Sequence, residues 1–204
     1  MSTNKTFKIL GLLLSYPSRD IVDALDECSV ILKSEALLPA DHFAPIEALI
    51  ATLKNTDLLS LETEYVGFFD MNNRLSLHLF EHTYGDSRDR GQAMVDMMSY
   101  YAEAGLQFAA KELPDYLPVF LEFLSTRPLE TARKALGRQV NILSILATRL
   151  HKNESAYAAI FDALVFLSGV KPNGEIVVAV LEKTGHERLT GDQLDREWEE
   201  KPAF

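Results

Sequence analysis

Cysteine is almost absent from this 204-residue sequence, in which Cys28 stands alone. A single cysteine cannot form an internal disulfide and cannot by itself build a thiolate metal site, so a reducing compartment suits the chain. Cys28 shares a three- and four-residue spacing with Ile21, Leu25 and Leu32, which is the spacing of one helix face. We therefore expect Cys28 to be a small buried core residue and not a nucleophile.

Basic residues are scarce relative to acidic ones, with 20 lysines and arginines against 30 aspartates and glutamates and a formal charge of -10. The averaged field repels phosphate backbones and anionic lipid headgroups, so we expect no nucleic-acid partner. The same field attracts cationic peptides, although an acidic surface also serves solubility alone.

Long apolar runs are missing as well. Residues 9–14 form an apolar stretch after Lys5 and Lys8, but this stretch is too short for a signal peptide and has no small-residue cleavage site before Tyr16-Pro17. No segment offers the ~20 apolar residues of a membrane span. We expect a cytoplasmic protein without stable membrane insertion.

The common signatures of nucleotide binding and nucleophilic catalysis are also missing. The sequence contains no G-x-x-x-x-G-K-[ST], no G-x-G-x-x-G and no G-x-S-x-G. The sole cysteine has no identifiable activating partner. Enzymes of these classes are therefore not indicated.

Helical periodicity, in contrast, runs through most of the sequence. Apolar positions recur at three- and four-residue steps, which predicts an all-α protein folded as a single-domain helical bundle over residues 1–184. The clearest stripe extends for about six turns from Leu129 to Leu150, directly after Pro128. Further helices are expected over residues 3–15, 39–54, 58–69, 87–104 and 116–125, and around residues 157–167. Another is expected over residues 21–32, where Ser18 can cap the exposed amide groups at the start. Only residues 176–180 are β-branched enough to compete with helix, and one short strand cannot form a sheet.

The C-terminal end of the sequence is polar and acidic. We expect residues 185–204 to form a mobile tail. Leu194 and Trp198 are four residues apart, so they would form an apolar anchor if the tail became helical on a partner.

The sharpest chemical pattern is His78-Leu79-Phe80-Glu81-His82, which has the H-x-x-E-H order of one group of zinc peptidases. On a helix, His78 and His82 would share a face beside the Glu81 carboxylate, so a metal-dependent hydrolase is one interpretation. A catalytic zinc needs a third protein ligand, and the sequence identifies none. In the alternative, the neighbouring apolar residues pack inward while the histidines and the glutamate form hydrogen bonds across a turn or to a partner.

A cluster of two acids and two arginines follows at a helix start, in residues 85–91. We expect Asp86 to cap this helix by accepting a hydrogen bond from the Asp89 amide, and to pair with Arg90 four residues later. Because the acids neutralise the field of the arginines, a structural charge cluster is favoured over an anion site.

Two further segments allow two interpretations each. Met94, Met97, Met98 and Tyr101 form either a soft apolar binding surface or part of the core. The prolines of residues 112–118 interrupt the helical pattern, which indicates either a hinge or a plain interhelical turn.

Several segments carry a resemblance that spans nearly the whole chain. They are residues 12–17 (LLLSYP), 61–66 (LETEYV) with Phe69 and Asp70, 76–82 (SLHLFEH), 85–96 (GDSRDRGQAMVD), 112–118 (ELPDYLP), 120–124 (FLEFL) and 194–198 (LDREW). Together they resemble the NarJ-type nitrate reductase assembly chaperones, or nitrate reductase delta subunit, within the helical TorD/DmsD-like superfamily of molybdoenzyme chaperones. Residues 112–116 look like the E-x-P-D-H motif of that superfamily. Tyr116 stands in place of the histidine, so a role specific to that histidine does not carry over.

The resemblance implies an all-helical chaperone that is not an enzyme. It implies binding of the N-terminal segment of the apo catalytic (alpha) subunit of a membrane-bound nitrate reductase, delayed membrane docking and assisted insertion of the molybdenum cofactor, which the chaperone does not hold stably. Contacts with cofactor-delivery proteins and a homodimer are left open. The candidate client-binding residues are Tyr65, Phe69, His78, Glu81, His82, Asp86, Arg88, Asp89, Arg90, Met94, Glu112, Pro114, Asp115 and Tyr116.

Overall fold

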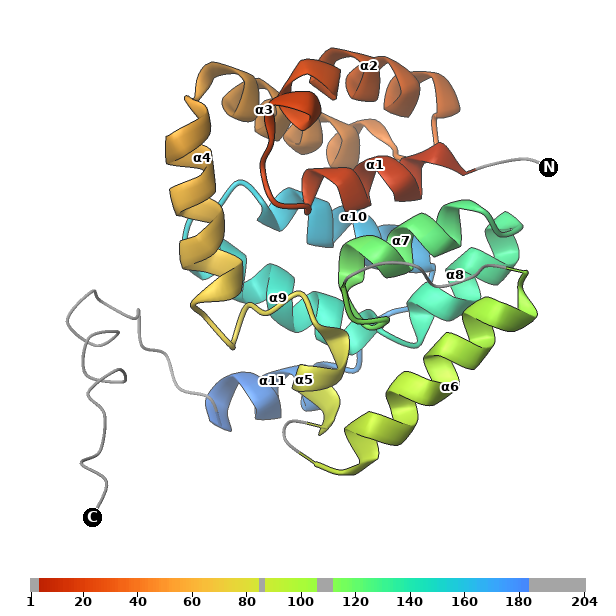
Figure 1. Ribbon diagram of the computed structural model, residues 1–204. Helices are drawn as coiled ribbons and strands as arrows, with labels where there is room; N and C mark the ends of the chain where they lie inside the picture. The colour runs from red at the N-terminus through yellow and green to blue at the C-terminus, as the bar shows by residue number, and fades with distance from the viewer. Residues whose placement is uncertain (1–3, 85–86, 106–111, 184–204) are drawn as a thin grey trace.

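Eleven α-helices and one π-helical turn make up most of the computed structural model, which describes residues 4–84, 87–105 and 112–183 (Figure 1). They are α1 (Lys5–Leu13), α2 (Arg19–Glu35), α3 (Ala40–Asn55), α4 (Leu58–Tyr65), η1 (Val66–Asp70), α5 (Leu79–Tyr84), α6 (Asp89–Glu103), α7 (Leu117–Ser125), α8 (Leu129–Gly137), α9 (Val140–Lys152), α10 (Ala158–Ser168) and α11 (Gly174–Lys183). The all-α prediction is confirmed. Within these ranges, no helix is both long enough and apolar enough to cross a membrane. The tail of residues 185–204 and its predicted anchor lie outside the described residues.

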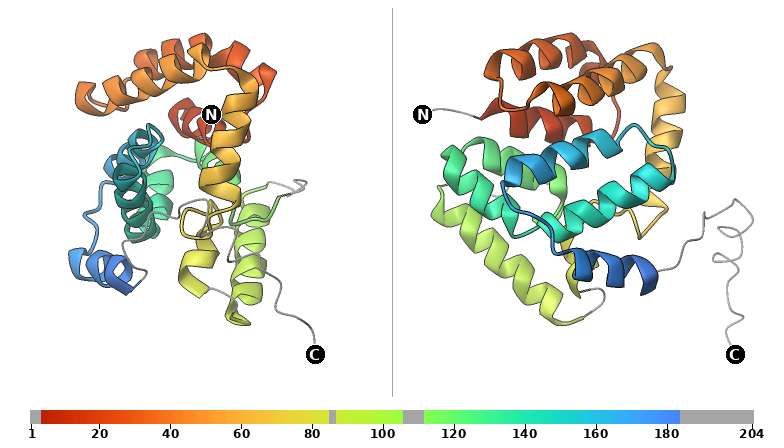
Figure 2. Two further views of the ribbon diagram at one scale, coloured as in Figure 1. Left: turned by 90° about the vertical axis from the view of Figure 1, so that its left-hand side faces the viewer. Right: turned by 180° about the vertical axis from the view of Figure 1, so that it is seen from behind.

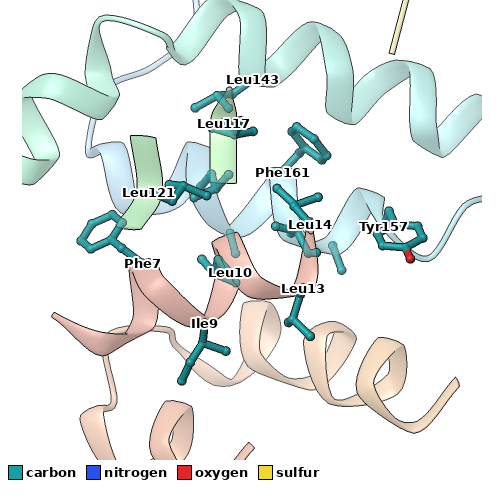
Figure 3. Packing of buried hydrophobic residues seen from close by; sticks show 14 of the residues in the cluster. Phe7, Ile9, Leu10, Leu13, Leu14, Leu117, Leu121, Leu143, Tyr157 and Phe161 are labelled. Carbon is teal, nitrogen blue, oxygen red and sulfur yellow. The ribbon is translucent and has the colours of Figure 1, made fainter. Parts of the chain in front are cut away.

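Helix α1 lies at the centre of the hydrophobic core. It packs against α2 and α7, while α10 packs against α3, α8 and α9. Phe7, Leu10 and Leu14 are completely buried, in one cluster with Leu121 of α7 and Phe161 of α10 (Figure 3). Because each such side chain contributes about 1.5–3 kcal/mol when it is buried, α1 is an essential part of the fold.

The apolar stripes predicted for α2 and α10 are buried. Leu25, Cys28 and Leu32 face the core from α2, which confirms the expectation for the cysteine. Burial raises the pKa of the Cys28 thiol, so little of the reactive thiolate forms. In α10, Phe161 and Leu164 are completely buried.

Two polar side chains cap the N-terminal ends of α1 and α2. The Ser18 hydroxyl accepts a hydrogen bond from the Ile21 amide at 3.3 Å, as expected. Glu35, the last residue of α2, accepts hydrogen bonds from the amides of Lys5 and Thr6 at 2.9 and 2.6 Å. These amides begin α1 and have no partner within it, so Glu35 satisfies them at the positive end of the helix dipole.

The prediction of one six-turn helix after Pro128 is wrong, because the chain breaks it into α8 and α9. The break follows Gly137, and glycine weakens a helix interior by about 1 kcal/mol relative to alanine. A β-carbon on Gly137 would lie 3.0 Å from the Val170 side chain, so the missing side chain also makes room for the segment after α10. The Gln139 amide then donates to the Leu136 carbonyl at 2.9 Å in the turn.

The β-branched residues 176–180 belong to a helix, α11. The Asn173 side chain accepts hydrogen bonds from the backbone amides of Glu175 and Ile176 at 3.0 and 3.3 Å. The backbone amide of Asn173 donates to the side chain of Asn141 in α9 at 2.8 Å. This cap starts the helix and attaches it to α9, which outweighs the β-propensity of the valines.

Candidate functional site

Asp115 is completely buried just before α7 and is the centre of a polar cluster. Its Oδ2 accepts a hydrogen bond from the Phe80 amide at 3.0 Å, and its Oδ1 accepts one from Nδ1 of His78 at 3.2 Å. Nη2 of Arg90 lies 3.9 Å from Oδ2. The hydrogen bond to Asp115 raises the pKa of His78. A buried carboxylate is costly unless it is paired, and here three groups pair it.

Backbone hydrogen bonds join the segment before α5 to the segment before α7. The Leu117 amide donates to the Leu77 carbonyl at 2.8 Å, and the Leu79 amide donates to the Asp115 carbonyl at 3.1 Å. Residues 112–116 therefore form a turn before α7 that is held on both sides of Asp115, and residues 117–118 begin the helix.

The two histidines of the H-x-x-E-H pattern bind different partners. Nε2 of His82 donates to the Ser76 carbonyl at 2.8 Å, and Glu81 accepts a hydrogen bond from Arg90 at 3.2 Å. Burial lowers the pKa of His82. Helix α5 begins only after His78, so the rings do not share a helix face as the hydrolase interpretation requires. In the part of the chain that the structure describes, no group of three His, Cys, Asp or Glu could hold a metal ion.

A pair of tyrosine hydroxyls connects α1 to the turn before α7. Tyr65, which precedes the π-helical turn η1, donates to the Leu14 carbonyl at 2.9 Å. The Tyr116 hydroxyl lies 2.8 Å away and therefore donates to the Tyr65 oxygen. Burial raises the pKa of Tyr65, so it stays a neutral donor. Phe69 packs beside it with ring centroids 5.0 Å apart. π-helical turns often occur at functional sites.

A groove of about 380 Å³ runs between α1 and α7. It is lined by Lys8, Gly11, Leu12, Ser15 and Tyr16 on one side, and by Glu112, Tyr116, Pro118, Val119 and Glu122 on the other. Gly11 lets the two helices approach, because a β-carbon there would lie 3.0 Å from the Pro118 carbonyl oxygen and 3.2 Å from Cβ of Leu121. Leu12, Tyr16 and Val119 give the groove apolar walls. Tyr116 connects the groove to the hydrogen bond with Tyr65.

The uncompensated negative charge of this groove lies on the side of Glu112. Glu122 pairs with Lys8 at 3.0 Å, but both side chains are well exposed and such a pair contributes little. Burial, together with the charge of Glu112, raises the pKa of Asp70. Two neighbouring carboxylates that repel each other would be stabilised by a cation brought between them.

The methionine-rich part of α6 divides between the two interpretations that the sequence allows. Tyr101 is buried and donates to the Pro114 carbonyl at 2.7 Å, and Met97 packs against the core. Met98 is 45% exposed and Val95 is 56% exposed on the outer side of the helix. One side of α6 is thus core and the other is open to solvent.

Of the candidate residues that the structure describes, Glu112 and Tyr116 line the groove. The buried candidates are Tyr65, Phe69, Pro114 and Asp115; the partly buried ones are His78, Glu81, His82, Arg90 and Met94; the exposed ones are Arg88 and Asp89. Asp86, with its predicted cap and ion pair, lies outside the described residues. Sequence reasoning missed the α1 side of the groove, although an isolated glycine in an apolar helix, Gly11, was a signal of close packing.

Comparison with known proteins agrees with this architecture. The family model described as nitrate reductase delta subunit matches residues 35–163. The Escherichia coli (strain K12) protein NarJ, described as a nitrate reductase molybdenum cofactor assembly chaperone, is 36% identical over 195 residues, which cover 95% of this chain and 81% of NarJ. NarW of the same strain is 36% identical over 194 residues, covering 95% of this chain and 80% of NarW.

One solved structure shares the fold. A proposed redox enzyme maturation protein from Archaeoglobus fulgidus superposes with a TM-score of 0.52 at 20% identity, covering 82% of this chain and 94% of that chain. At this identity the likeness concerns the fold alone. The family model and the similarity to NarJ and NarW show that the chain belongs to the nitrate reductase delta subunit family of molybdenum cofactor assembly chaperones.

Proposed function

We propose that the chain binds the N-terminal segment of the apo catalytic subunit of a nitrate reductase in the groove between α1 and α7. In this function it acts in the cytoplasm, delays membrane docking of the client and assists insertion of the molybdenum cofactor. As a member of a family of assembly chaperones, it is a maturation factor and not an enzyme.

The observation that carries the proposal is the combination of apolar walls and negative charge at Glu112. Leu12, Tyr16 and Val119 offer apolar surface, and a volume of about 380 Å³ is within the range of ligand pockets. An amphipathic helix would place its apolar stripe between α1 and α7. A basic residue of that helix would meet Glu112, where the neighbouring Asp70 adds a second negative charge.

Titration calorimetry with a 15-residue peptide copied from the N-terminus of the cognate catalytic subunit tests the proposal. We expect micromolar or tighter binding, which Val119→Asp abolishes because it places a charge in the apolar wall. Val30→Asp is the matched control, since Val30 is 66% exposed on α2 and lies outside the groove lining. Glu112→Gln should weaken binding at low salt, whereas Glu130→Gln on α8 should not. Absence of binding, or equal loss in Val119→Asp and Val30→Asp, contradicts the proposal.

A further inference from the structure

A second cavity, of about 370 Å³, lies between the start of α3 and α10, two helices that pack together. Seen from behind, these helices run side by side on a face that α1 and α7 do not form (Figure 2). Asp41, His42 and Pro45 line the cavity from α3, and Ala159, Asp162 and Phe166 line it from α10. It shares no lining residue with the groove between α1 and α7.

An aromatic ring forms one wall of this cavity. Phe166 is 42% exposed, which is unusual for a phenylalanine on a helix that is otherwise buried in the core. The His42 ring packs on it with centroids 4.6 Å apart at 33°, which holds the phenylalanine in place from the α3 side. The apolar surface of the cavity is completed by small and aliphatic groups, including Ala159.

Two carboxylates face this cavity from different helices. Asp41 is in the first turn of α3, and Asp162 is on α10. Oδ2 of Asp162 accepts a hydrogen bond from Nε2 of His151 at 2.7 Å, which orients the carboxylate while leaving its other oxygen for a ligand. The lining contains no lysine or arginine. The cavity is therefore negative, and an anionic ligand would be repelled.

We propose that this cavity binds an arginine side chain presented by a partner protein. A planar guanidinium stacks on an aromatic face and hydrogen-bonds carboxylates in its own plane, so it can use Phe166 and the two aspartates together. A lysine ammonium is more strongly hydrated and has no flat face for the ring. The proposal is independent of client binding in the groove, because it rests on other residues of other helices.

The shape of the site favours a side chain on a protein over a free small molecule. Phe166 is exposed at this cavity, so a guanidinium stacked on the ring leaves the rest of the chain that carries it outside, in solvent. One such contact gives weak affinity alone, and it becomes effective as part of a larger interface. Free arginine adds an α-ammonium and a carboxylate whose charges cancel, so it gains no net attraction to the aspartates over an arginine in a peptide.

Amide NMR spectra of the full chain, titrated with the capped tripeptide acetyl-Ala-Arg-Ala-amide, test this proposal. We expect saturable shifts of the amides of residues 41–44 and 159–166 at millimolar peptide concentrations. The corresponding citrulline peptide, which is neutral and almost isosteric, should bind at least tenfold more weakly, and the lysine peptide about threefold more weakly. Equal shifts with the citrulline peptide, no saturation, or tighter binding of free arginine than of the capped peptide overturns the proposal.

Variants localise the site within the same experiment. Asp41→Asn and Asp162→Asn should each weaken binding of the arginine peptide about threefold, and the double variant about tenfold. Asp20→Asn is the matched control, because Asp20 occupies the first turn of α2 as Asp41 does that of α3. Val119→Asp, which tests the groove, should leave the shifts unchanged. If Asp41→Asn and Asp20→Asn bind the peptide equally, the site is not the one proposed.

Discussion

Replacement of Asp115 by asparagine probes the buried polar cluster most directly. The variant keeps the size of the side chain but removes the charge that pairs His78 and Arg90, and its amide group cannot accept from both Phe80 and His78. Hydrogen bonds to charged groups contribute about 1.5–3 kcal/mol, and breaking a buried pair costs about 3–5 kcal/mol. We expect Asp115→Asn to lower the free energy of unfolding by about 2–4 kcal/mol. With a slope near 2 kcal/mol/M, the urea midpoint would fall by about 1–2 M.

The pH dependence of this loss identifies its cause. Because Asp115 raises the folded-state pKa of His78, the pairing stabilises the protein fully below the ordinary histidine pKa of 6.5 and is lost as pH rises through the raised value. Burial lowers the pKa of His82, and this contribution of burial is present in both proteins, so it cancels in their difference. The charge of Asp115 opposes that lowering, so its removal adds to the loss of stability at low pH. Urea unfolding at pH 6 and pH 8 should therefore show the larger difference at pH 6. A difference that is equal or larger at pH 8, or a variant as stable as the exposed control Asp96→Asn, would refute the reasoning.

Three other substitutions and one thiol reaction test separate parts of the fold. Gly11→Ala should lower the free energy of unfolding, measured in urea, by about 1–3 kcal/mol, because the new methyl group would lie 3.0 Å from a backbone oxygen of α7. Gly91→Ala in α6 should instead raise it by about 0.5–1 kcal/mol, because a methyl group there meets no atom within 4 Å. Glu35→Gln should cost about 1–2 kcal/mol in the same assay by weakening the cap on the Thr6 amide, and an unchanged midpoint would contradict the cap. Cys28 should react with a thiol reagent at least about tenfold more slowly in the native protein than in urea, since burial raises its pKa; equal rates would show that the thiol is accessible.

Periodicity predicted the helices well because most of them bury one stripe. Leu25, Cys28 and Leu32 follow that rule in α2, and the expected starts and ends agree with the structure to within a few residues. One prediction was wrong and one segment was left undecided, and both depend on contacts that no local pattern contains. Gly137 ends α8 where the segment after α10 passes, and the Asn173 side chain caps the start of α11 while its backbone amide donates to Asn141 of α9.

The groove was harder to predict because its walls come from segments more than 90 residues apart. The pattern around Lys8 and Tyr16 reads as an ordinary amphipathic helix, and nothing in it shows that α7 lies alongside. Charged motifs drew the prediction to residues 78–90, where His78 and Arg90 pair with Asp115 and Arg90 also pairs with Glu81. Charge density in a sequence does not distinguish a buried network from an exposed binding surface.

The buried cluster and the groove are nevertheless connected through Tyr116. Asp115 fixes the turn before α7, and the next residue, Tyr116, lines the groove and donates to Tyr65. Substitution of Asp115 should therefore alter client binding without any contact between this residue and the client. A double-mutant cycle between Asp115→Asn and Val119→Ala, measured by peptide titration, should show a coupling energy of about 0.5–2 kcal/mol. In a second cycle, Arg88→Ala replaces Asp115→Asn, and because Arg88 is exposed, its effect on peptide binding should add to that of Val119→Ala within about 0.5 kcal/mol. Equal coupling energies in the two cycles would mean that Asp115 does not position the groove.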